Sequence, residues 1–489
     1  MLTETANEDS RLSLWLRVRE FAVPPSMIET ATARRHAGDW AGACAAAGID
    51  VDLDLRRTSR THGRTLAARI RADLRHLAPD LLRWHMPRIA PDGLLRPGLT
   101  VPLARYDAEG QDAAGHDGAG HERAGRDGAA PVYLVVRTAP AWADAGQRIS
   151  LALWDASRPG DGAGRHPHPR PDRRFRLDLH RHLWDGRRTG ELRIRSGADR
   201  LPVGGRMPTD PELPVPVPWQ GHCAVDRWAA EAEILLRAGG RAAGSVTVRF
   251  GARQRLVLDR APVDGYGTPV LRIAPAPADG RASALPVLPD AATWVLPDLE
   301  LIRTGSIRAD RLHPLVASAL VPDHAAGQVP GHARAGAADP GHRPGQPRLV
   351  ECRGARHRIG LVDGVLVPLD HDPDEIRREE LLVALTGTPL PCLQAIDLAH
   401  RRPDCLTGVR ERLAHGDTAG ALDVVAGLLG PDALLRPGAL RDALEAAAHQ
   451  RITHGLFRAG LAGPGPGRTY PGTTRPREHR SHPRQAISR

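Results

Sequence analysis

The chain has 489 residues, a net charge of +10 and no lysine, so its complement of 67 Lys and Arg residues is entirely arginine. The missing lysine excludes Schiff-base enzymes, phosphate-loop ATPases, protein kinases and metal centres bridged by a carbamylated lysine. Arginine cannot take these roles because it stays charged at any working pH. The length, with 41% apolar residues, predicts a folded protein of two or three domains.

The first part, residues 1–107, is expected to form a helical domain with one short acidic strand. A helix is predicted over residues 26–38, and Asp39 is placed to cap a second helix that ends at Gly48. These two helices would form a helical hairpin. A third helix is predicted near Thr65, because Leu66, Ile70 and later leucines recur at the spacing of one helix face.

The segment GIDVDLDLRR, residues 48–57, alternates apolar and acidic residues with a period of two. An extended strand would place Asp50, Asp52 and Asp54 on one face. Three carboxylates in a row could bind a divalent metal, or they could form the solvated or arginine-paired face of a strand. The segment follows a helix stop and ends in two arginines, so the strand face is the favoured interpretation and the metal site is the alternative.

The run RRTSRTHGRTLAARIRADLRH, residues 56–76, is rich in arginine and falls partly on the third helix. Arg64, Arg71 and Arg75 would share one helix face beside the apolar stripe. A solvated amphipathic face is the favoured interpretation, and contact with nucleic-acid phosphates is the alternative. The run lacks aromatic residues for base stacking, which argues against binding to single strands.

Residues 108–130 have the composition of a disordered Ala/Gly/His insertion. Residues 131–323 are expected to form a β-rich middle domain, because β-branched and apolar residues dominate residues 132–136, 149–154, 245–250 and 255–259. Proline is dense around these segments, as in PELPVPVPW, and this density predicts short strands in irregular sheets.

The middle domain contains RLDLHRHLWDG, in which Asp178, His180 and His182 form a D-x-H-x-H motif. The motif resembles the signature of amidohydrolase-like metal hydrolases, and that resemblance implies that both imidazoles bind one divalent ion. The sequence that follows lacks the alternating strands and helices of those barrels, and the chain has no lysine ligand. A paired surface or interface histidine is therefore favoured, with a metal-dependent hydrolase as the alternative.

Residues 324–348 have the composition of a disordered Gly/Pro/His linker, and residues 349–462 are expected to form a β-hairpin followed by helices. Asp372 and Pro373 mark the start of one helix, and further helices are predicted near residues 404–414, 418–429 and 439–458. The pattern R-x-x-x-G-D-x-A-G-A occurs at residues 34–43 and 412–421, which predicts two similarly built helical hairpins. Residues 463–489 are expected to form a disordered basic tail, whose six arginines and one glutamate give 6 − 1 = +5.

The five cysteines are scattered singly, without a CxxC pair, which favours reduced thiols in a cytoplasmic protein. Cys392 is interpreted as a small core residue. The N-terminus, MLTETANEDS, carries acids where a signal peptide needs positive charge, and no apolar run approaches membrane-spanning length. We therefore expect a cytoplasmic protein without a membrane partner.

Two segments, LWLRVREFAVPPSMIETATARR and RIGLVDGVLVPLDHDPDEIRREELLVALTGTPLPCLQAID, resemble an uncharacterised protein family of GC-rich bacteria with no assigned activity. The resemblance implies a folded family and supplies no catalytic residues. The predicted fold is α+β, with helical N-terminal and C-terminal parts flanking a strand-rich, proline-rich middle with disordered insertions.

The favoured function is a non-enzymatic scaffold that binds an unidentified protein partner through its helical ends. We expect no cofactor, and a divalent metal belongs only to the hydrolase alternative. Weak nucleic-acid binding through the arginine-rich tail and the basic helix is a second alternative.

Overall fold

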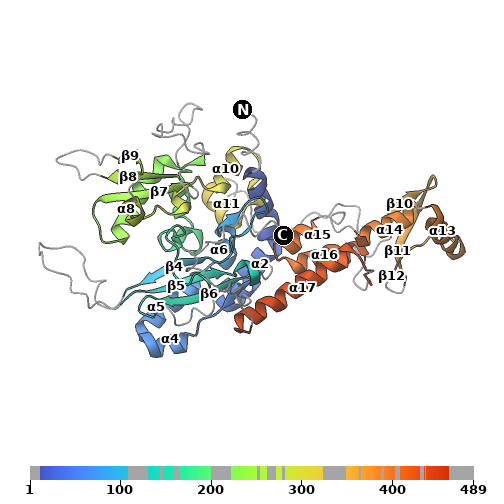
Figure 1. Cartoon of the computed structure of the whole chain (residues 1–489), viewed down its shortest axis with the longest axis horizontal. Coiled ribbons are helices and arrows are strands. Elements are labelled where there is room, and N and C mark those ends of the chain that lie inside the picture. The colour runs from blue at the N-terminus through green and yellow to red at the C-terminus, as the bar shows by residue number, and fades with distance from the viewer. Residues whose placement is uncertain are drawn as a thin grey trace, which may run out of the picture. The chain divides into compact units, whose positions relative to one another are not determined.

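The computed structural model describes residues 11–107, 130–143, 147–158, 166–199, 222–250, 254–260, 271–277, 281–322, 348–362, 365–386, 390–401, 408–429, 434–435 and 437–461. The expected insertion at 108–130, linker at 324–348 and tail at 463–489 lie outside these ranges, apart from residues 130 and 348. The chain divides into two compact units, residues 1–141 with 148–327 and residues 142–147 with 328–489. Both units contain helices and strands (Figure 1), which confirms the α+β class.

The first unit begins with helices. Residues 11–17 are helical and continue into the π-helical turn η1 (Val18–Ala22). The predicted hairpin is confirmed, because α2 (Pro25–His36) and α3 (Trp40–Ala46) are joined by a turn in which the Asp39 side chain caps α3. Three further helices follow, of which the second is the helix expected near Thr65: α4 (Leu55–His62), α5 (Arg64–His76) and α6 (Pro79–His85).

A four-stranded sheet joins these helices to the expected middle domain. Its strand order is β1 (Ile49–Val51), β6 (Ile149–Asp155), β5 (Val132–Thr138) and β4 (Thr100–Tyr106). β1 runs parallel to β6, and the other neighbours are antiparallel; β4, β5 and β6 lie side by side in Figure 1. The expected boundary at residues 107 and 131 does not separate two domains, because β4 and β5 pair across it.

A second sheet completes the first unit. β7 (Gly244–Phe250), β8 (Gln254–Arg260) and β9 (Leu271–Pro275) are antiparallel, and they pack with α8 (Trp228–Ala238) around the buried Trp228 ring. The strands expected near 132, 149, 245 and 255 are thus confirmed. The remaining elements are short: β2 (Arg88–Ile89), β3 (Leu94–Leu95), η2 (Ala141–Ala143), η3 (Leu177–Leu179), η4 (Arg181–Leu183), α7 (Glu191–Ser196), η7 (Val225–Arg227), η8 (Arg281–Ala284), α9 (Asp290–Thr293), α10 (Pro297–Arg303), η9 (Ala309–Arg311) and α11 (Pro314–Leu320).

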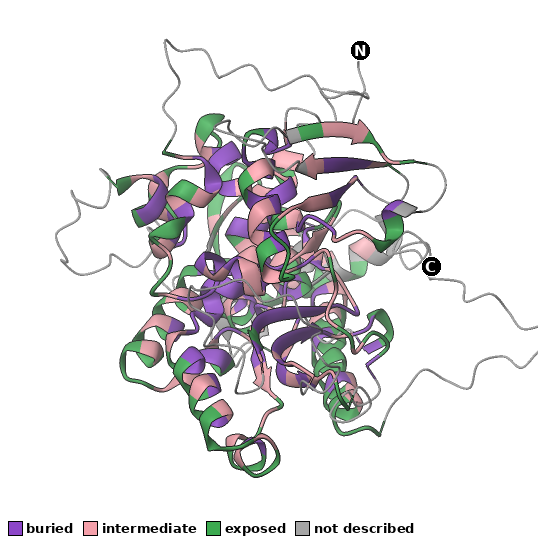
Figure 2. Ribbon diagram, turned by 90° about the vertical axis from the view of Figure 1, so that its left-hand side faces the viewer, coloured by how far each residue is buried: buried purple, intermediate pink, exposed green. Residues whose placement is uncertain are grey.

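The core of the first unit is built from the helices and the main sheet together. Leu74 of α5, Leu82 of α6, Leu103 of β4 and Val136 of β5 are all fully buried in one cluster. Each such side chain contributes about 1.5–3 kcal/mol through burial. In Figure 2 the buried residues (purple) line the inner sides of helices and strands, and exposed residues (green) lie on their outer turns.

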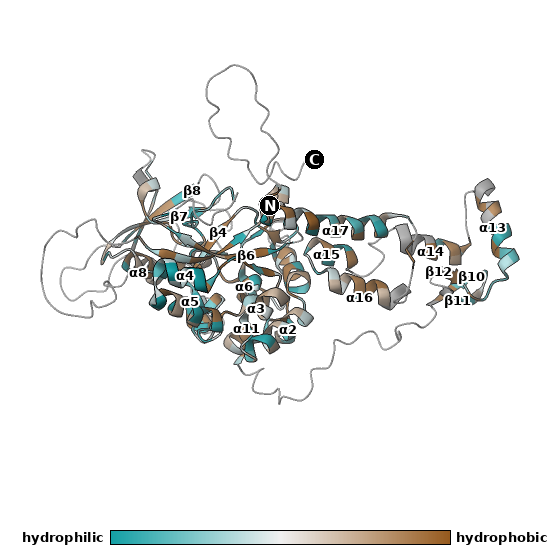
Figure 3. Cartoon of the chain, turned by 90° about the horizontal axis from the view of Figure 1, so that it is seen from below, coloured by the Kyte–Doolittle hydropathy of each residue, from teal (hydrophilic) through white to brown (hydrophobic). Residues whose placement is uncertain are grey.

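The second unit contains a small sheet and five helices among its described residues. β10 (Arg348–Cys352), β11 (Ala355–Val362) and β12 (Val365–Pro368) are antiparallel. The helices begin at Pro373, as expected, and include one near residue 391 that the sequence analysis missed: α13 (Pro373–Thr386), α14 (Pro391–Arg401), α15 (Val409–Ala414), α16 (Thr418–Leu429) and α17 (Ala439–Arg458). Figure 3 shows that α17 carries both hydrophobic (brown) and hydrophilic (teal) residues.

Within the described ranges, no helix combines the length and apolar composition needed to cross a bilayer.

Candidate functional site: an arginine-rich cavity

A cavity of about 250 Å³ lies in the first unit. Its walls come from the N-terminal helix, the end of α6, the turns η3 and η4, α7, η7 and the segment from α9 to α10. These elements lie between residues 11 and 297, so only the fold brings them together. The volume is close to the lower limit of sites for small organic ligands, roughly 300–1,000 Å³.

The N-terminal helix supplies one wall. Arg11, Trp15 and Arg19 all line the cavity, and their four-residue spacing places them on one helix face. The Arg19 guanidinium lies 5.3 Å from the centre of the Trp15 ring and 4.3 Å from that of Trp84. At Val18 the helix passes into the π-helical turn η1, a geometry that is frequent at functional sites.

A buried ion pair supports this wall. Asp298 is 0% exposed, and it accepts hydrogen bonds from Nη2 of Arg19 at 2.7 Å and from Nε1 of Trp84 at 3.0 Å. Arg19 also donates to the Trp84 carbonyl at 2.7 Å. Burial lowers the pKa of Arg19, and the Asp298 carboxylate acts in the opposite direction. The carboxylate therefore makes this buried cation tolerable.

The lining of the whole cavity is strongly cationic. Seven arginines line the cavity against a single carboxylate, Asp290. Four of the arginines, including Arg19, are held by acids outside the lining; the other three pairs are Arg11 with Glu300 (3.1 Å), Arg176 with Asp178 (2.8 and 2.7 Å) and Arg195 with Glu231 (2.7 and 2.7 Å). Arg227 donates to the carbonyls of Arg195 and Trp294.

Arg88 and Arg96 differ from these, because in the described part of the chain neither has a carboxylate at ion-pair distance. Arg88 donates only to the carbonyls of Arg83, at 2.7 Å, and Gly93, at 3.4 Å. Burial, and then the charges of Arg83 and Arg19, lower the pKa of Arg88 well below its usual value. Burial, and then the charge of Arg174, also lower the pKa of Arg96, although the carboxylates of Asp290 and Asp172 act in the opposite direction. Arg88 is thus held at a cost that a bound anion would relieve, and the same anion would add to the partial compensation of Arg96.

The rest of the lining is apolar and aromatic. Trp84, Trp294 and Phe175 supply ring surfaces, and Leu177 and Leu192 supply aliphatic ones. Trp84 is almost completely buried in the core, while Trp294 is half-buried. Arginines beside large rings favour a ligand that has both a negative charge and a planar apolar body.

Two uncharged imidazoles also line the cavity. Burial lowers the pKa of His85 to about 4, although Asp298 opposes this shift. Burial, followed by the nearby His180, lowers the pKa of His182 well below its usual value. Nε2 of His85 and Nδ1 of His182 are buried without a hydrogen-bond partner. Each ring can therefore exchange a hydrogen bond with a ligand while staying neutral at pH 7.

The predicted D-x-H-x-H residues lie in η3, in η4 and between them, and their ligand atoms do not converge on one metal position. Asp178 is held by Arg176, and His180 places Nδ1 2.9 Å from the Arg176 carbonyl and Nε2 3.2 Å from the Glu231 carboxylate. Among the described residues, Asp178, His180 and His182 do not gather their ligand atoms into a metal-binding group. Of the expected surface or interface pair, the surface position is wrong, because His180 and His182 are 2% and 4% exposed.

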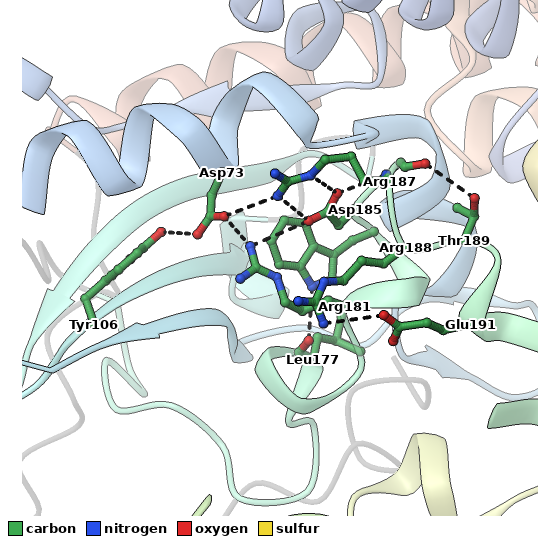
Figure 4. A network of polar contacts seen from close by, with 11 residues as sticks. Asp73, Tyr106, Leu177, Arg181, Asp185, Arg187, Arg188, Thr189 and Glu191 are labelled. Atoms are coloured by element: carbon green, nitrogen blue, oxygen red, sulfur yellow. Dashed lines mark hydrogen bonds and ion pairs between the residues drawn. The ribbon is translucent and has the colours of Figure 1, made fainter. Parts of the chain in front are cut away.

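A polar network fixes the turn that carries these histidines (Figure 4). Asp73 of α5 accepts hydrogen bonds from the Tyr106 hydroxyl of β4, at 2.8 Å, and from Arg181. Asp185 accepts from the backbone N of Arg187 at 3.0 Å and from its Nη2 at 2.9 Å. Burial, and then Asp73, raise the pKa of Tyr106, so its hydroxyl stays protonated and donates. The network ties the turn to α5 and β4.

The acidic stripe has separate structural roles. The strand is shorter than expected, because β1 ends at Val51 and Asp54 already caps α4 by accepting from the backbone N atoms of residues 56 and 57. Asp50 forms two hydrogen bonds with Arg148, at 2.9 and 2.6 Å, and Asp52 is exposed. In the described ranges none of the three belongs to a metal-binding group. The prediction of arginine pairing holds for Asp50, although its partner lies on the neighbouring strand segment.

The basic face of the third helix is where the sequence placed it. Arg64, Arg71 and Arg75 are exposed on α5. Within the described part of the chain, none of them forms an ion pair. The face suits either a solvated surface or phosphate contact, and nucleic-acid binding stays a prediction.

The cavity could not be predicted from the sequence. The D-x-H-x-H motif points to His182, but as a metal ligand, and the arginines carry no shared spacing because they come from separate elements. The one local signal is the spacing of Arg11, Trp15 and Arg19, which repeats a basic or aromatic residue every fourth position.

The fold and the cavity together define an α+β protein with a cationic, tryptophan-lined cavity. Comparisons of the chain with protein-family models, with curated proteins and with solved structures gave no match. The functional argument therefore rests on the residues of the cavity.

Proposed function

We propose that the first unit binds a small organic anion in the arginine-rich cavity. The observation that carries the proposal is the excess of cations in its wall, above all Arg88 and Arg96, neither of which has a carboxylate at ion-pair distance among the described residues. A buried cation without a counter-charge is costly, and a ligand carboxylate or phosphate would supply that charge. Arginine also suits this task because its planar fork donates paired hydrogen bonds to such groups.

The lining further favours an anion with a planar apolar body. Trp84, Trp294 and Phe175 offer ring surfaces beside the guanidinium groups. Inorganic phosphate would satisfy the charge but leave these surfaces without contacts, whereas an aromatic phosphate or carboxylate would use both. Apolar burial contributes roughly 25 cal/mol per Å² of surface removed from water, so the ring should add measurably to affinity.

The same geometry favours binding over the metal-dependent hydrolase suggested by the motif. Asp178 would have to leave Arg176, and His180 would have to leave Glu231, before either could bind an ion with His182. Burial alone would raise the pKa of Glu231, but the hydrogen bonds from His180 and Arg195 lower it to about 2. Glu231 is thus a firmly ionised partner that holds His180 away from a metal role.

Ligand-dependent unfolding of the full chain tests the proposal. Phenyl phosphate carries both charge and ring, inorganic phosphate carries the charge alone, and benzyl alcohol carries the ring alone. A ligand that binds only the folded state stabilises it by about 2.7 kcal/mol at a hundredfold excess over Kd. We expect the largest shift in unfolding temperature from phenyl phosphate, a smaller one from phosphate and none from benzyl alcohol.

A matched pair of variants identifies the site. Arg96→Met removes a cation from the cavity, and Arg71→Met removes an exposed cation from α5. The phenyl phosphate shift should largely disappear in Arg96→Met and persist in Arg71→Met. No shift in the wild type, or equal loss in both variants, would contradict the proposal.

A second proposal keeps the sequence-based expectation of a protein partner at the helical ends. It is supported by the exposed apolar side chains of the second unit, among them Leu381, Leu422, Ile452 and Leu456. Ile452 and Leu456 are 59% and 41% exposed and lie four residues apart, on one face of α17. A single face of this kind suits an amphipathic helix of the partner.

Cross-linking in the native host tests this second proposal. An Ile452→Asp/Leu456→Asp variant should lose a partner that the wild type retains, and Gln450→Asp, also on an exposed position of α17, should retain it. A partner captured equally by all three chains would exclude this face. The cytoplasmic location stays a prediction, which fractionation of the host cells would check.

A further inference from the structure

The second unit brings together two cysteines and one histidine from three different elements. The potential ligand atoms of Cys352, His371 and Cys392 all lie within 4.8 Å of one another, and all three residues are buried. Across the described residues, this is the one group of three or more His, Cys, Asp or Glu side chains that meets in this way. Two thiols and an imidazole are ligands that Zn²⁺ prefers.

The backbone explains why the two cysteines meet. Cys352 ends β10 and pairs with Ala355 across a two-residue turn, in which Arg353 and Gly354 have φ angles of 52° and 79°. Positive φ at both positions is the geometry that closes a tight hairpin. Cys392 is the second residue of α14, a helix of 11 residues that packs against β10.

His371 is oriented as a metal ligand would be. Its side chain is 3% exposed, and its Nδ1 lies 3.5 Å from Oε2 of Glu375. Its Nε2 is buried without a hydrogen-bond partner. Glu375 is itself held by Arg353 at 2.7 Å, next to Cys352 in the chain. A carboxylate on one ring nitrogen that leaves the other free is the usual arrangement around a metal-bound histidine.

A second imidazole lies beside the group. His357 of β11 stacks on His371 with ring centres 4.2 Å apart and planes inclined by 12°. Its Nδ1 is also buried without a hydrogen-bond partner. Buried polar atoms almost always find a partner, so the free Nε2 of His371 beside two thiols indicates a missing one, with a second free imidazole nitrogen close by.

We propose that Cys352, His371 and Cys392 bind one Zn²⁺ ion, with His357 next to the fourth coordination position. On binding, each thiol gives up its proton, so two protons leave for solvent as two Zn–S bonds form, and no oxidant or reductant takes part. The ion would link the end of β10, the segment after β12 and the start of α14. It is a structural cross-link of the second unit and does not depend on the cavity of the first.

Metal analysis of the tag-free full chain, after dialysis with Zn²⁺, tests the proposal. Wild type should hold one Zn²⁺ per chain, and Cys392→Ser and His371→Ala should each lose it. Cys223→Ser, which replaces a buried thiol of the first unit, should keep it. An equal zinc content in wild type and Cys392→Ser, as expected if the histidines of residues 108–130 and 324–348 held the ion instead, would overturn the proposal.

A second measurement uses only the wild-type protein, so its result does not depend on whether the variants fold. Titration of the metal-free wild type with Co²⁺ should give the sulfur-to-cobalt charge-transfer band and the strong visible bands of a tetrahedral site, which added Zn²⁺ should abolish. Peptide mapping without reductant shows whether Cys352 and Cys392 form a disulfide instead of binding a metal. A Cys352–Cys392 disulfide in freshly purified protein, or weak octahedral Co²⁺ bands, would contradict zinc binding.

Discussion

Replacing Asp298 by asparagine should destabilise the first unit, because it removes the carboxylate that pairs with buried Arg19. The two side chains are 0% and 2% exposed and their closest atoms lie 2.7 Å apart. Asparagine keeps nearly the same shape, and its Oδ1 can still accept the hydrogen bond from Trp84. The substitution therefore removes one negative charge and places the amide Nδ2, a donor, opposite Nη2 of Arg19.

The expected magnitude follows from the burial of the pair. Removing one partner of a buried ion pair costs about 3–5 kcal/mol, because the remaining charge is left without compensation. Arg19 keeps its hydrogen bond to the Trp84 carbonyl and its contacts with two rings, so we expect the lower end of that range. In the double variant Arg19→Met/Asp298→Asn the orphan charge is gone. The double variant should therefore lose less unfolding free energy than the two single variants lose in total.

Urea unfolding followed by tryptophan fluorescence measures this effect. Every tryptophan except Trp142 lies in the sequence range of the first unit, so the signal reports mainly on that unit. The Asp298→Asn midpoint should fall with an unchanged slope. A single variant within about 1 kcal/mol of the wild type, or a double variant as unstable as the two singles combined, would refute the reasoning.

Three further predictions concern other parts of the chain. Burial lowers the pKa of His85, and that of His166, from 6.5 to about 4. Each neutral imidazole therefore contributes stability that is complete above pH 6.5 and is lost as the pH falls toward 4, on the order of 3 kcal/mol per residue. An unfolding free energy that does not change between about pH 6.5 and pH 4 would contradict this prediction. Asp417→Ala should cost about 0.5–2 kcal/mol by removing the cap of α16, seen as faster hydrogen exchange in that helix; unchanged exchange would show that the cap is dispensable. If α5 contacts nucleic acid, replacing Arg64, Arg71 and Arg75 by glutamine should reduce the salt dependence of binding to a random duplex, and duplex binding that is absent or independent of salt would end that alternative.

Much of the local structure could be predicted from the sequence. The repeated R-x-x-x-G-D-x-A-G-A pattern forms the same turn twice, because Asp39 and Asp417 each accept a hydrogen bond from the backbone three residues later, at 2.8 and 2.9 Å. The glycine of the pattern leaves room for that carboxylate: a Cβ on Gly42 would lie 2.0 Å from Asp39 Oδ2, and one on Gly420 would lie 2.3 Å from Asp417 Oδ2. Side chains a few residues apart decide such turns, so their pattern is visible in the sequence.

The long-range features could not be predicted in the same way. β4 pairs with β5 across residues 107–131, and its ladder shifts register between Pro102 and Ala104, so no simple alternation identifies it. The missed helix α14 begins at Pro391, within a proline-containing stretch for which no element was predicted.

The candidate sites could not be predicted either, because tertiary packing brings their residues together from distant parts of the sequence. Nothing in the sequence distinguishes Arg88 and Arg96 from the other arginines; only the fold leaves them without a carboxylate at ion-pair distance among the described residues. Cys352 and Cys392 stand 40 residues apart, far from the short spacing by which a metal site is usually recognised.

Calorimetric titration of phenyl phosphate into the full chain tests the central claim, anion binding in the arginine-rich cavity, most directly. A charge-assisted hydrogen bond contributes about 1.5–3 kcal/mol, so Arg96→Met should weaken binding by about tenfold to a hundredfold relative to wild type. Arg71→Met should bind as the wild type does. Saturable one-site binding with this pattern is the predicted result, and heats that are absent from the wild type, or identical in wild type and Arg96→Met, would contradict it.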